Sequence, residues 1–261
     1  MADGFDARTA YSVAGKVVIV TGGGTGIGKV YSQRLAEAGA RVVLADIAGE
    51  ASNDVAATIR EAGGEALSVP TDVTDPAAVQ AMADQAAETF GGIDGLINNA
   101  SMMSVLPRGD WFEISPERWD AVMAVNLKGI FLCCRAVYPY MKKRGGGRIV
   151  NISSSRIWEG NPNRLDYTTS KAGVVGLTRA LAREVGDDRI GVNAVTPGFT
   201  MSETQVASSS SNYMGGKDEG KCFKRPQYPD DLVGTVMFLL SDAAGYMTGQ
   251  TINVDGGTYM H

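Results

Sequence analysis

The stretch that decides the fold reads Val-Val-Ile-Val-Thr-Gly-Gly-Gly-Thr-Gly-Ile-Gly and covers residues 17–28. Its first part is β-branched and apolar without alternation, a pattern typical of a strand buried on both faces. A glycine-rich turn follows directly, and residues 29–38 have the apolar spacing of a helix that Gly39 ends. Glycine lets the main chain approach a ligand closely, and the free N–H groups of a helix N-terminus favour a pyrophosphate.

A glycine cluster alone is weak support for a dinucleotide site, because loops also collect glycine for conformational reasons. Here the flanking strand and helix supply the context that such a site requires. We therefore predict that this unit binds a dinucleotide. The residues expected to contact it are Gly22, Thr25, Gly26, Ile27 and Gly28.

The second predicted strand, residues 41–46, ends in the carboxylate of Asp46. An acid at this position can accept hydrogen bonds from both hydroxyls of the adenosine ribose and would repel a 2′-phosphate. The residues that follow, Ile47 and Ala48, are not basic. The sequence therefore predicts NAD rather than NADP as the cofactor, with Asp46 and Ile47 beside the adenosine. The alternative is an acid that is simply solvated at a strand end.

Strands and helices alternate along the rest of the chain. Further strands are expected at 66–70, 93–97, 148–152, 190–195 and 251–254, and further helices at 50–62, 75–90, 112–143, 167–185 and 230–240. This alternation predicts an α/β fold with a parallel, doubly wound, Rossmann-like sheet and helices on both faces. No repeat or linker divides it, so residues 16–261 are expected to form one dinucleotide-binding and catalytic domain after a flexible tail at 1–15.

Further cofactor contacts are expected where other strands end. Asp72 closes the third strand, where its side chain could bond the exocyclic amine of an adenine, and Val73 follows it. The small residues after the fourth strand, including Asn99, would let the main chain come close to a ligand. Pro197 and Gly198 break the sixth strand and complete this set.

Composition and charge exclude several classes of protein. The chain has 261 residues, 44% apolar and 20% charged, which is typical of a globular protein. A net charge of -5 without a basic stripe argues against nucleic acid as a partner. No apolar run reaches the length needed to cross a bilayer and residues 1–15 lack a signal-peptide pattern, so we expect no membrane association and a cytoplasmic location. Cys133, Cys134, Cys222 and the single histidine, His261, provide neither a disulfide framework nor a metal site.

Tyr167 and Lys171 stand four residues apart in a segment with helical spacing, so both side chains should project from one face of a helix. A tyrosine hydroxyl titrates near pH ~10, and a nearby ammonium favours the phenolate. Lowering that pKa to about 7 needs roughly 4 kcal/mol, which a lysine in a water-poor cleft, helped by a cationic cofactor ring, could supply. Taken alone, the pair could equally be solvated on an ordinary helix.

Two other polar features are candidates for the same site. Asn126 sits among apolar neighbours, and a buried asparagine needs hydrogen-bond partners, either as a structural bridge or in a polar relay. Residues 153–155 are three serines at the end of the fifth predicted strand. Ligands of parallel α/β sheets gather outside the carboxyl ends of the strands, so these hydroxyls should face the cofactor crevice.

Together these motifs resemble the short-chain dehydrogenase/reductase family. The resemblance covers residues 16–257 and rests on motifs in the family's order: Thr21-Gly22-x-x-x-Gly26-x-Gly28, Asp72, Asn98-Asn99-Ala100, Asn126, Ser154, Tyr167-x-x-x-Lys171 and Pro197-Gly198. It implies a single Rossmann-like domain with a seven-stranded parallel sheet. It also implies a homo-oligomer, commonly a homotetramer.

The resemblance implies a role for each catalytic residue. Tyr167 would be the general acid/base, and Ser154 would hold the substrate oxygen. Lys171 would bind the nicotinamide ribose and lower the pKa of Tyr167, and Asn126 would hold a water that links Lys171 to bulk solvent. In the oxidative direction the Tyr167 phenolate would take the alcohol proton while the hydride passes to NAD. The implied activity is interconversion of a secondary alcohol and a ketone.

Three positions depart from the family pattern. Ser101 stands where glycine is usual, so the main chain there could sit differently against the cofactor. After Pro197-Gly198, Thr200 and Ser202 replace the usual branched aliphatic residue and threonine. We still expect both to contact the cofactor, through main chain and hydroxyl.

Residues 199–225 form a long segment without a clear pattern, which we predict to be a mobile substrate lid with one or two short helices. The pocket should be walled by this lid and by the loops after strands four and five. The wall residues expected are Met102, Met103, Arg156, Trp158, Glu159, Asn161, Phe199, Met201 and Met214. Methionine and aromatic side chains suit an apolar, aromatic or cyclic small-molecule substrate, although they could equally pack the lid. Arg156 could instead favour an anionic group.

Two alternatives stay open. One is a 3-oxoacyl thioester reductase of the same fold, which Asp46 disfavours because such reductases usually use NADPH. The other is a non-enzymatic NAD(H)-binding sensor or structural protein. The complete set of Asn126, Ser154, Tyr167 and Lys171 argues against that second alternative.

Overall fold

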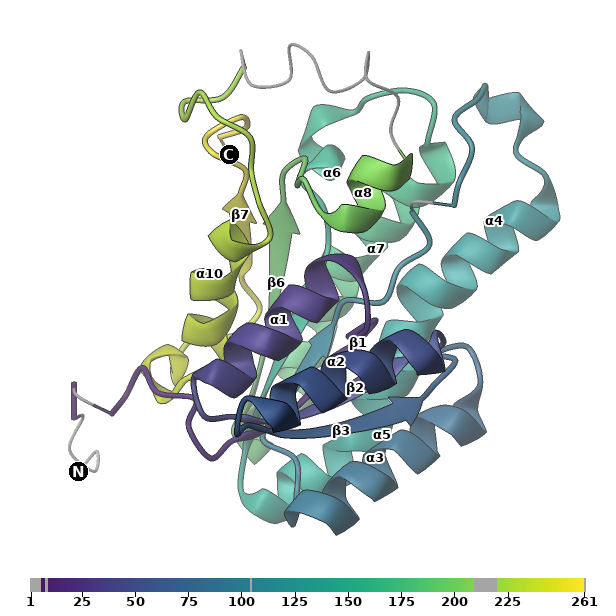
Figure 1. The fold of residues 1–261 in the computed structure, drawn as a ribbon. Coiled ribbons are helices and arrows are strands. Elements are labelled where there is room, and N and C mark those ends of the chain that lie inside the picture. Colours follow the sequence, from purple (N-terminus) through teal and green to yellow (C-terminus); the bar gives the residue numbers. More distant parts are fainter. Residues whose placement is uncertain (1–5, 8, 104, 209–219, 261) are drawn as a thin grey trace.

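The computed structural model describes residues 6–7, 9–103, 105–208 and 220–260. At its centre lies a seven-stranded sheet in the order β3-β2-β1-β4-β5-β6-β7, in which every neighbouring pair is parallel (Figure 1). The strands are β1 Val17–Thr21, β2 Arg41–Asp46, β3 Glu65–Pro70, β4 Gly95–Asn98, β5 Gly147–Ile152, β6 Ile190–Pro197 and β7 Thr251–Val254. The predicted fold class is confirmed, and the strand order reverses between β1 and β4, where a crevice for a ligand is expected.

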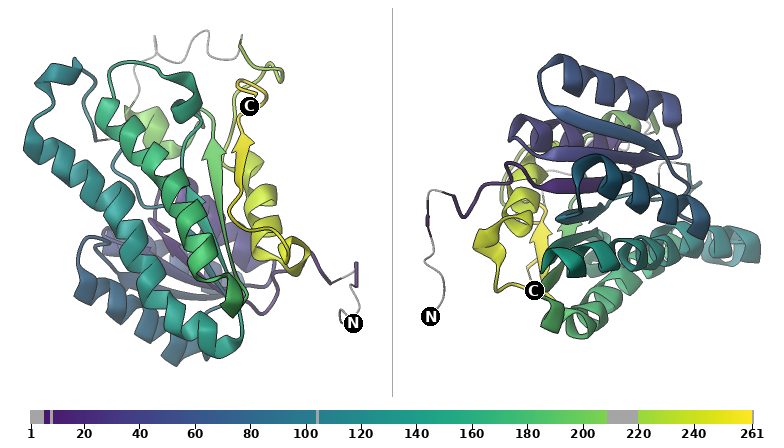
Figure 2. Two further views of the ribbon diagram at one scale, coloured as in Figure 1. Left: turned by 180° about the vertical axis from the view of Figure 1, so that it is seen from behind. Right: turned by 90° about the horizontal axis from the view of Figure 1, so that it is seen from below.

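Helices cover both faces of the sheet (Figure 2). The longer helices are α1 Gly26–Glu37, α2 Gly49–Glu61, α3 Pro76–Phe90, α4 Pro116–Met123, α5 Gly129–Arg144, α7 Leu165–Glu184 and α10 Asp230–Leu240. Short helices are α6 Arg156–Glu159 and α8 Glu203–Ser208, with 3₁₀ turns η1 Trp111–Glu113, η3 Gly186–Asp188 and η4 Asp242–Ala244 and a π-helix, η2 Ala124–Lys128. Helices α3, α5 and α7 pack on one face, and α1, α2 and α10 on the other.

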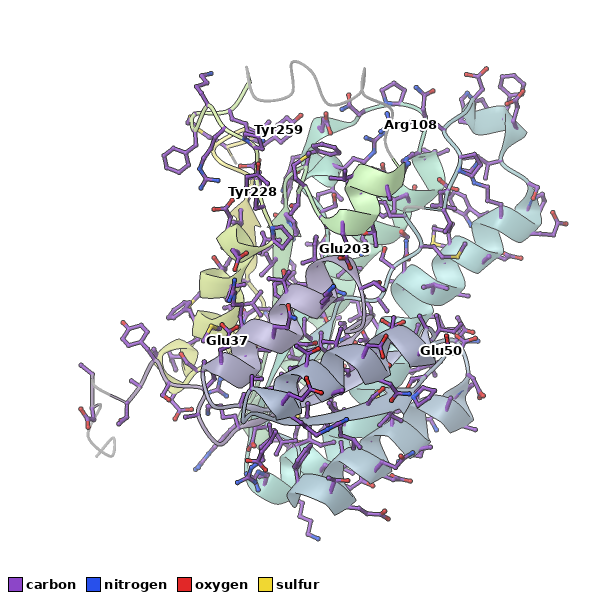
Figure 3. The ribbon with its side chains drawn as sticks, in the orientation of Figure 1. Glu37, Glu50, Arg108, Glu203, Tyr228 and Tyr259 are labelled. Atoms are coloured by element: carbon purple, nitrogen blue, oxygen red, sulfur yellow. The ribbon has the colours of Figure 1, made fainter. Side chains whose placement is uncertain are left out.

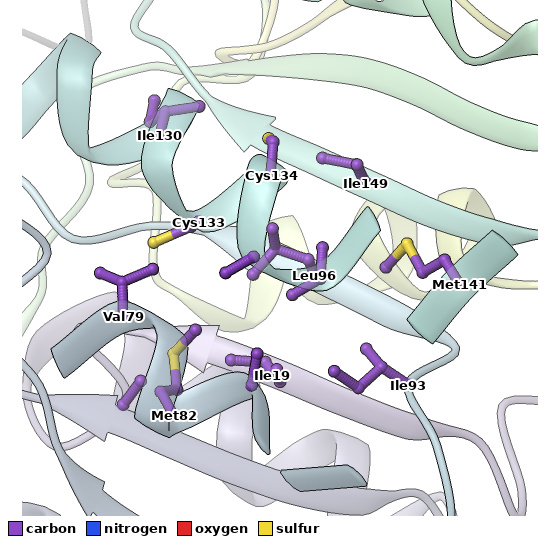
Figure 4. Close-up of a cluster of buried hydrophobic side chains, with 14 of the residues drawn as sticks. Ile19, Val79, Met82, Ile93, Leu96, Ile130, Cys133, Cys134, Met141 and Ile149 are labelled. Carbon is purple, nitrogen blue, oxygen red and sulfur yellow. The ribbon is translucent and has the colours of Figure 1, made fainter. Parts of the chain in front are cut away.

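The two faces of each strand supply two separate cores, because side chains alternate along a strand. In β1, Val17 and Ile19 face the α3, α5 and α7 layer, whereas Val18 and Val20 face the other. Figure 4 shows the first core, where side chains of α3 and α5 meet Ile19 and its neighbours on β4 and β5. All of β1 is buried, which explains its continuous apolar run and fixes the glycine turn at its end.

Helix boundaries follow local chemistry. The Asp75 side chain accepts a hydrogen bond from the Ala77 amide (2.8 Å) and caps α3, whose other end is Gly91 with φ 81°. Helix α1 begins at Gly26, three residues earlier than predicted, so the glycine run forms its first turn. The start of α1 therefore lies inside the turn that was predicted to hold a pyrophosphate.

Helices α4, η2 and α5 form one continuous helix of 29 residues, from Pro116 to Arg144. It contains an 18-residue window of mean hydropathy 1.5, so the expectation that no apolar run is long enough to cross a membrane is wrong by length and composition. Half of that window is buried inside the fold, and α5 packs against α3 and β5. Packing in the core accounts for the buried half of this apolar window.

The segment before β1 is also more ordered than predicted. Ala10 and Val13 are buried, and the Ala10 carbonyl accepts a hydrogen bond of 2.8 Å from the Ala243 amide. The ring of Tyr11 stacks on Phe238 of α10. The predicted flexible tail at 1–15 is therefore wrong for its last residues, because their apolar side chains pack along α10; residues 1–5 and 8 lie outside the described residues.

Candidate active site

A cavity of about 800 Å³ opens at the carboxyl ends of the strands. It brings together nearly all the residues predicted for the site: Gly22, Thr25, Gly26, Ile27, Asp46, Ile47, Asp72, Val73, Asn99, Ser154, Tyr167, Lys171, Pro197, Gly198, Thr200 and Ser202. Gly28 and Asn126 do not line it. Both contribute from behind the cavity wall.

The glycine turn leaves no room for a side chain at position 28. A Cβ atom on Gly28 would lie 1.9 Å from the carbonyl oxygen of Gly22, and Gly22 itself has φ 64°. The side chain of Asn99 secures the turn from β4, since its Nδ2 donates to the carbonyls of Thr21 (3.0 Å) and Gly22 (3.2 Å). Only glycine satisfies this geometry at position 28, because a side chain there would collide with the Gly22 carbonyl.

An acidic side chain reaches the first turn of α1 from α8. Thr25 makes no side-chain cap, and the Gly26 amide donates instead to Glu203 Oε1 (3.2 Å). Lys29 Nζ lies 3.3 Å from Glu203 Oε2, and Figure 3 shows Glu203 between α8 and α1. The amide end of this helix therefore accepts an anion in this structure. Sequence reasoning missed Glu203, because it lies 177 positions away in the chain and only the fold brings it here.

Two carboxylates stand at the ends of β2 and β3. Asp46 is buried, and its oxygens accept hydrogen bonds from the amides of Gly24 (2.8 Å) and Ala48 (2.9 Å). Asp72 Oδ1 accepts from the amide and hydroxyl of Thr74, both at 2.8 Å. Among the described residues that line the cavity, the only basic ones are Arg156, at the start of α6, and Lys171, on α7. The glycine-turn end of the cavity thus combines acid groups with the amides of a helix N-terminus.

The catalytic candidates lie at the other end. Ser154 lies beside Tyr167, close enough to influence its hydroxyl, and Lys171 Nζ stands 5.8 Å from the centre of the Tyr167 ring. Lys171 is almost fully buried and donates to the carbonyl of Ile152 (2.8 Å). The Ser153 hydroxyl in turn donates to the Lys171 carbonyl (2.7 Å), which joins α7 to the end of β5.

Burial dominates the pKa values of this group. It lowers the pKa of Lys171 to about 7. It also raises the pKa of Tyr167, against the opposing effects of the Ser154 hydrogen bond and of the Arg164 and Arg156 charges. The expectation that Lys171 lowers the pKa of Tyr167 is therefore not met by the protein's own groups. The physical reason is that Lys171 is itself desolvated and points its ammonium at a carbonyl.

Asn126 is fully buried in η2 and bridges two elements. Its Oδ1 accepts from the Met102 amide (2.7 Å) and the Ser101 hydroxyl (3.2 Å), and its Nδ2 donates to Ser170 Oγ (3.1 Å) and to the Met102 carbonyl (3.4 Å). These bonds use the whole capacity of the amide. The water that was expected at Asn126 therefore has no side-chain atom to hold it, and only the main chain of that residue is left for this role.

Ser101, which stands where the family usually has glycine, has a structural role because its hydroxyl donates a hydrogen bond to Asn126. Ser170 carries the connection further, because its hydroxyl also donates to the Tyr167 carbonyl (2.7 Å). A chain of hydrogen bonds thus runs from the loop after β4, through Asn126, to the turn of α7 that bears Tyr167. The position of Tyr167 depends on it.

A buried ion pair holds the start of α7. Arg118 Nε of α4 lies 2.7 Å from Asp166 Oδ2, and the Asp166 side chain is fully buried. The other carboxylate oxygen accepts from the Tyr167 amide (2.8 Å). No local pattern indicates this pair, because its members lie 48 positions apart in the chain. Asp166 positions Tyr167 from the main-chain side.

The Tyr167 end of the cavity is walled by fewer residues than predicted. Met102, Met103, Arg156, Glu159 and Phe199 line the cavity, joined by Val105 and Gln205. Trp158, Asn161 and Met201 do not line it, and Met214 lies outside the described residues. Of the predicted lid at 199–225, residues 209–219 also lie outside them, and α8 is the short helix in the described part.

Comparison with known proteins bears directly on this arrangement. The family model described as enoyl-(acyl carrier protein) reductase matches residues 22–259. An uncharacterized oxidoreductase from Mycobacterium tuberculosis is 43% identical over 242 residues, covering 93% of this chain and 96% of that protein. Cis-4-hydroxycyclohexanecarboxylate dehydrogenase from Sinomonas cyclohexanicum is 38% identical over 244 residues, covering 94% and 96%.

A solved structure is similar over the same length. It is 7 alpha-hydroxysteroid dehydrogenase complexed with NADH and 7-oxo glycochenodeoxycholic acid, with a TM-score of 0.91, 30% identity, and coverage of 97% of this chain and 98% of that one. The fold, the glycine turn and the family match agree with one another. This chain is an oxidoreductase that belongs to the short-chain dehydrogenase/reductase family.

Proposed function

We propose that this protein is an NAD-dependent oxidoreductase that interconverts a secondary alcohol and a ketone on an apolar, cyclic or aromatic substrate. One observation carries the proposal: Ser154, Tyr167 and Lys171 share a single cavity with the glycine turn and Asp46. Tyr167, which can exchange a proton, therefore lies in the same cavity as the residues suited to bind a dinucleotide.

The residues present fit a nicotinamide dinucleotide. The tight Gly22 to Gly28 turn and the amides at the start of α1 suit its pyrophosphate, and the Glu203 carboxylate shows that this end accepts an anion. Asp46 suits the ribose hydroxyls, and the absence of Arg or Lys among the described residues lining that end favours NAD over NADP. When bound, the nicotinamide ring supplies hydride transfer at the substrate carbon.

The protein's own part in the reaction is proton movement and positioning. Tyr167 gives or takes the proton of the substrate oxygen, and the Ser154 hydroxyl, which lies beside Tyr167, fixes that oxygen. Lys171, with a pKa lowered to about 7 by burial, can exchange a proton at neutral pH. Asn126 and Asp166 hold the helix turn that carries Tyr167. Burial excludes water from this end and keeps the exchange directed to the substrate.

The residues that line the Tyr167 end of the cavity favour a substrate with an apolar body. Met102, Met103, Val105 and Phe199 supply flexible or aromatic surface there. Two of the similar proteins are named for ring substrates, a cyclohexane carboxylic acid and a steroid. Both facts favour a ring-bearing secondary alcohol over a short linear one.

Initial rates test the proposal. We would measure NADH formation by the wild-type protein from a panel of cyclic, aromatic and linear secondary alcohols, with NAD and with NADP. We expect turnover with NAD and a cyclic alcohol. Turnover confined to 3-oxoacyl thioesters with NADPH would favour the thioester reductase instead. NAD binding without turnover of any alcohol or ketone would favour the non-enzymatic sensor.

We further propose that copies of the chain assemble into a homo-oligomer, a homotetramer, through the outer face of α4, α5 and α7. Phe131 on this face is 51% exposed, and it lines a shallow groove with Met123, Leu127 and Leu177. An apolar patch of this kind favours a partner surface. Light scattering of the wild type and of Phe131→Glu tests this: we expect a smaller assembly for the variant, and an unchanged mass would contradict it.

A further inference from the structure

Arg156 lies near Ser154, and two main-chain carbonyls hold its guanidinium. It begins α6, two residues after Ser154, and it lines the cavity. Its Nη2 donates to the carbonyls of Asn161 (2.9 Å) and Pro162 (2.5 Å), which fixes the plane of the guanidinium. Its Nε is fully buried and has no hydrogen-bond partner among the described residues. A buried donor without a partner is unfavourable by about 1–3 kcal/mol, so internal hydrogen bonds do not fully satisfy this guanidinium.

A second guanidinium, that of Arg164, lies near this end of the cavity. Arg156 and Arg164 both act to lower the pKa of Tyr167, so both charges are felt at its hydroxyl. Arg164 is buried and its Nη1 donates to the Met103 carbonyl (2.8 Å), which keeps it in place. Arg164 does not itself line the cavity, so an anionic group that entered here would meet Arg156 and feel Arg164 only at longer range.

One acid, Glu159, lines the same end of the cavity, and it has another partner. Tyr259 lies beside Glu159, and burial together with the Glu159 charge raises the pKa of Tyr259 to about 12. Tyr259 is therefore a neutral donor at ordinary pH. No ion pair joins Glu159 to Arg156, although both belong to the described part of the chain. Arg156 therefore lines the cavity without an acid partner among the described residues, and Glu159 faces Tyr259 of the C-terminal segment.

We infer that the substrate carries a carboxylate and that Arg156 binds it, which makes the substrate a hydroxy or keto acid with an apolar ring or chain between its two oxygen functions. The inference rests on the proposed function. It adds the residue that selects the substrate: Ser154 and Tyr167 hold the reacting oxygen, and a guanidinium with a fixed plane is suited to a planar carboxylate.

Binding of neutral and anionic probes of equal shape tests this without turnover. We would titrate the protein saturated with NADH by calorimetry with three pairs: cyclohexanecarboxylate and cyclohexanecarboxamide, benzoate and benzamide, and phenylacetate and phenylacetamide. We expect the carboxylate of at least one pair to bind about tenfold to a hundredfold more tightly than its amide. Equal affinity within every pair overturns the inference, and so does the failure of all six to bind.

Three variants test whether Arg156 causes the preference for a carboxylate. Arg156→Gln should abolish it, because the amide can still donate to the Asn161 carbonyl but carries no charge, whereas Arg156→Lys should retain part of it. Arg183→Gln, an exposed arginine on α7 that does not line the cavity, should leave it unchanged. A carboxylate preference that survives Arg156→Gln overturns the assignment, and melting temperatures confirm that each variant is folded.

Turnover separates this inference from the proposed function. With NAD, 4-hydroxycyclohexanecarboxylate should react with a higher kcat/KM than 4-hydroxycyclohexanecarboxamide, and Arg156→Gln should remove the difference mainly through KM. Oxidation of neutral alcohols without any preference for acids overturns the inference and leaves the proposed function standing. A carboxylate preference in binding without turnover of any alcohol supports the inference and contradicts the proposed function.

Discussion

The two ends of the cavity are built by different means. The glycine-turn end is formed mainly by the main chain. A Cβ on Gly28 would lie 1.9 Å from a carbonyl in this turn, and the strand ends present Asp46 and Asp72. At the Tyr167 end, side chains from separate loops meet, and Arg156 and Phe199 come from the ends of different strands. The first end is determined by local sterics, and the second by contacts between distant segments.

This difference explains what could be predicted from the sequence. All seven strands and the residues at their carboxyl ends follow from local patterns of β-branched runs and glycine turns. Glu203 on the Gly26 amide and the Arg118–Asp166 pair do not, because each joins segments far apart in the chain. The π-helix around Asn126 also escaped prediction, since its apolar spacing matches that of an ordinary helix.

The largest effect is expected at the Tyr167 end. Tyr167→Phe removes the acid/base hydroxyl and should lower kcat about 10²- to 10⁴-fold, while NADH affinity stays within about twofold. Tyr246→Phe, at a fully exposed tyrosine, is the matched control and should keep full activity. Steady-state rates and NADH fluorescence titrations measure the two quantities. Retained turnover in Tyr167→Phe would contradict the assigned role.

A side chain at position 28 should disrupt the glycine-turn end for steric reasons. Gly28→Ala forces the turn away from the Gly22 carbonyl and should lower the free energy of unfolding by about 2–3 kcal/mol, with loss of NADH binding. Gly234→Ala, on α10 with open space around its Cβ position, should be neutral or slightly stabilising. Urea unfolding and NADH titration compare them. If Gly28→Ala behaved like the control, the turn would not be sterically fixed.

The buried lysine makes stability depend on pH in a defined direction. Burial lowers the pKa of Lys171 to about 7, below its unfolded value of about 10.4. The penalty for burying the charge is complete below pH 7 and declines as pH rises to about 10, because only the unfolded chain then keeps the proton. Lys171→Met should therefore stabilise the protein without ligand by about 1–3 kcal/mol near pH 6.5 and lose that gain by pH 10.

Unfolding curves at the two pH values measure this effect. Lys143→Met, at an exposed lysine on α5, serves as the control and should change the free energy of unfolding by less than about 0.5 kcal/mol at either pH. A gain for Lys171→Met that is equal at pH 6.5 and pH 10 would mean that the lysine is not charged at a cost in the folded protein.

The smallest effect is expected at Glu203. Its carboxylate and a dinucleotide phosphate compete for the Gly26 amide, so Glu203→Gln should tighten NADH binding by about threefold to tenfold at low salt. Glu50→Gln, at an exposed acid in the first turn of the neighbouring helix α2 (Figure 3), is the matched control. Unchanged or weaker NADH binding in Glu203→Gln would show that the two anions do not compete.

The central claim is that one cavity holds a dinucleotide on the glycine turn and a substrate oxygen on Tyr167. A crystal structure of the complex with NADH and a cyclic keto acid tests it most directly. The account predicts ribose hydroxyls within hydrogen-bond distance of Asp46, and a ketone oxygen between the hydroxyls of Ser154 and Tyr167. A dinucleotide bound away from the glycine turn, or a ketone oxygen held by neither hydroxyl, would contradict it.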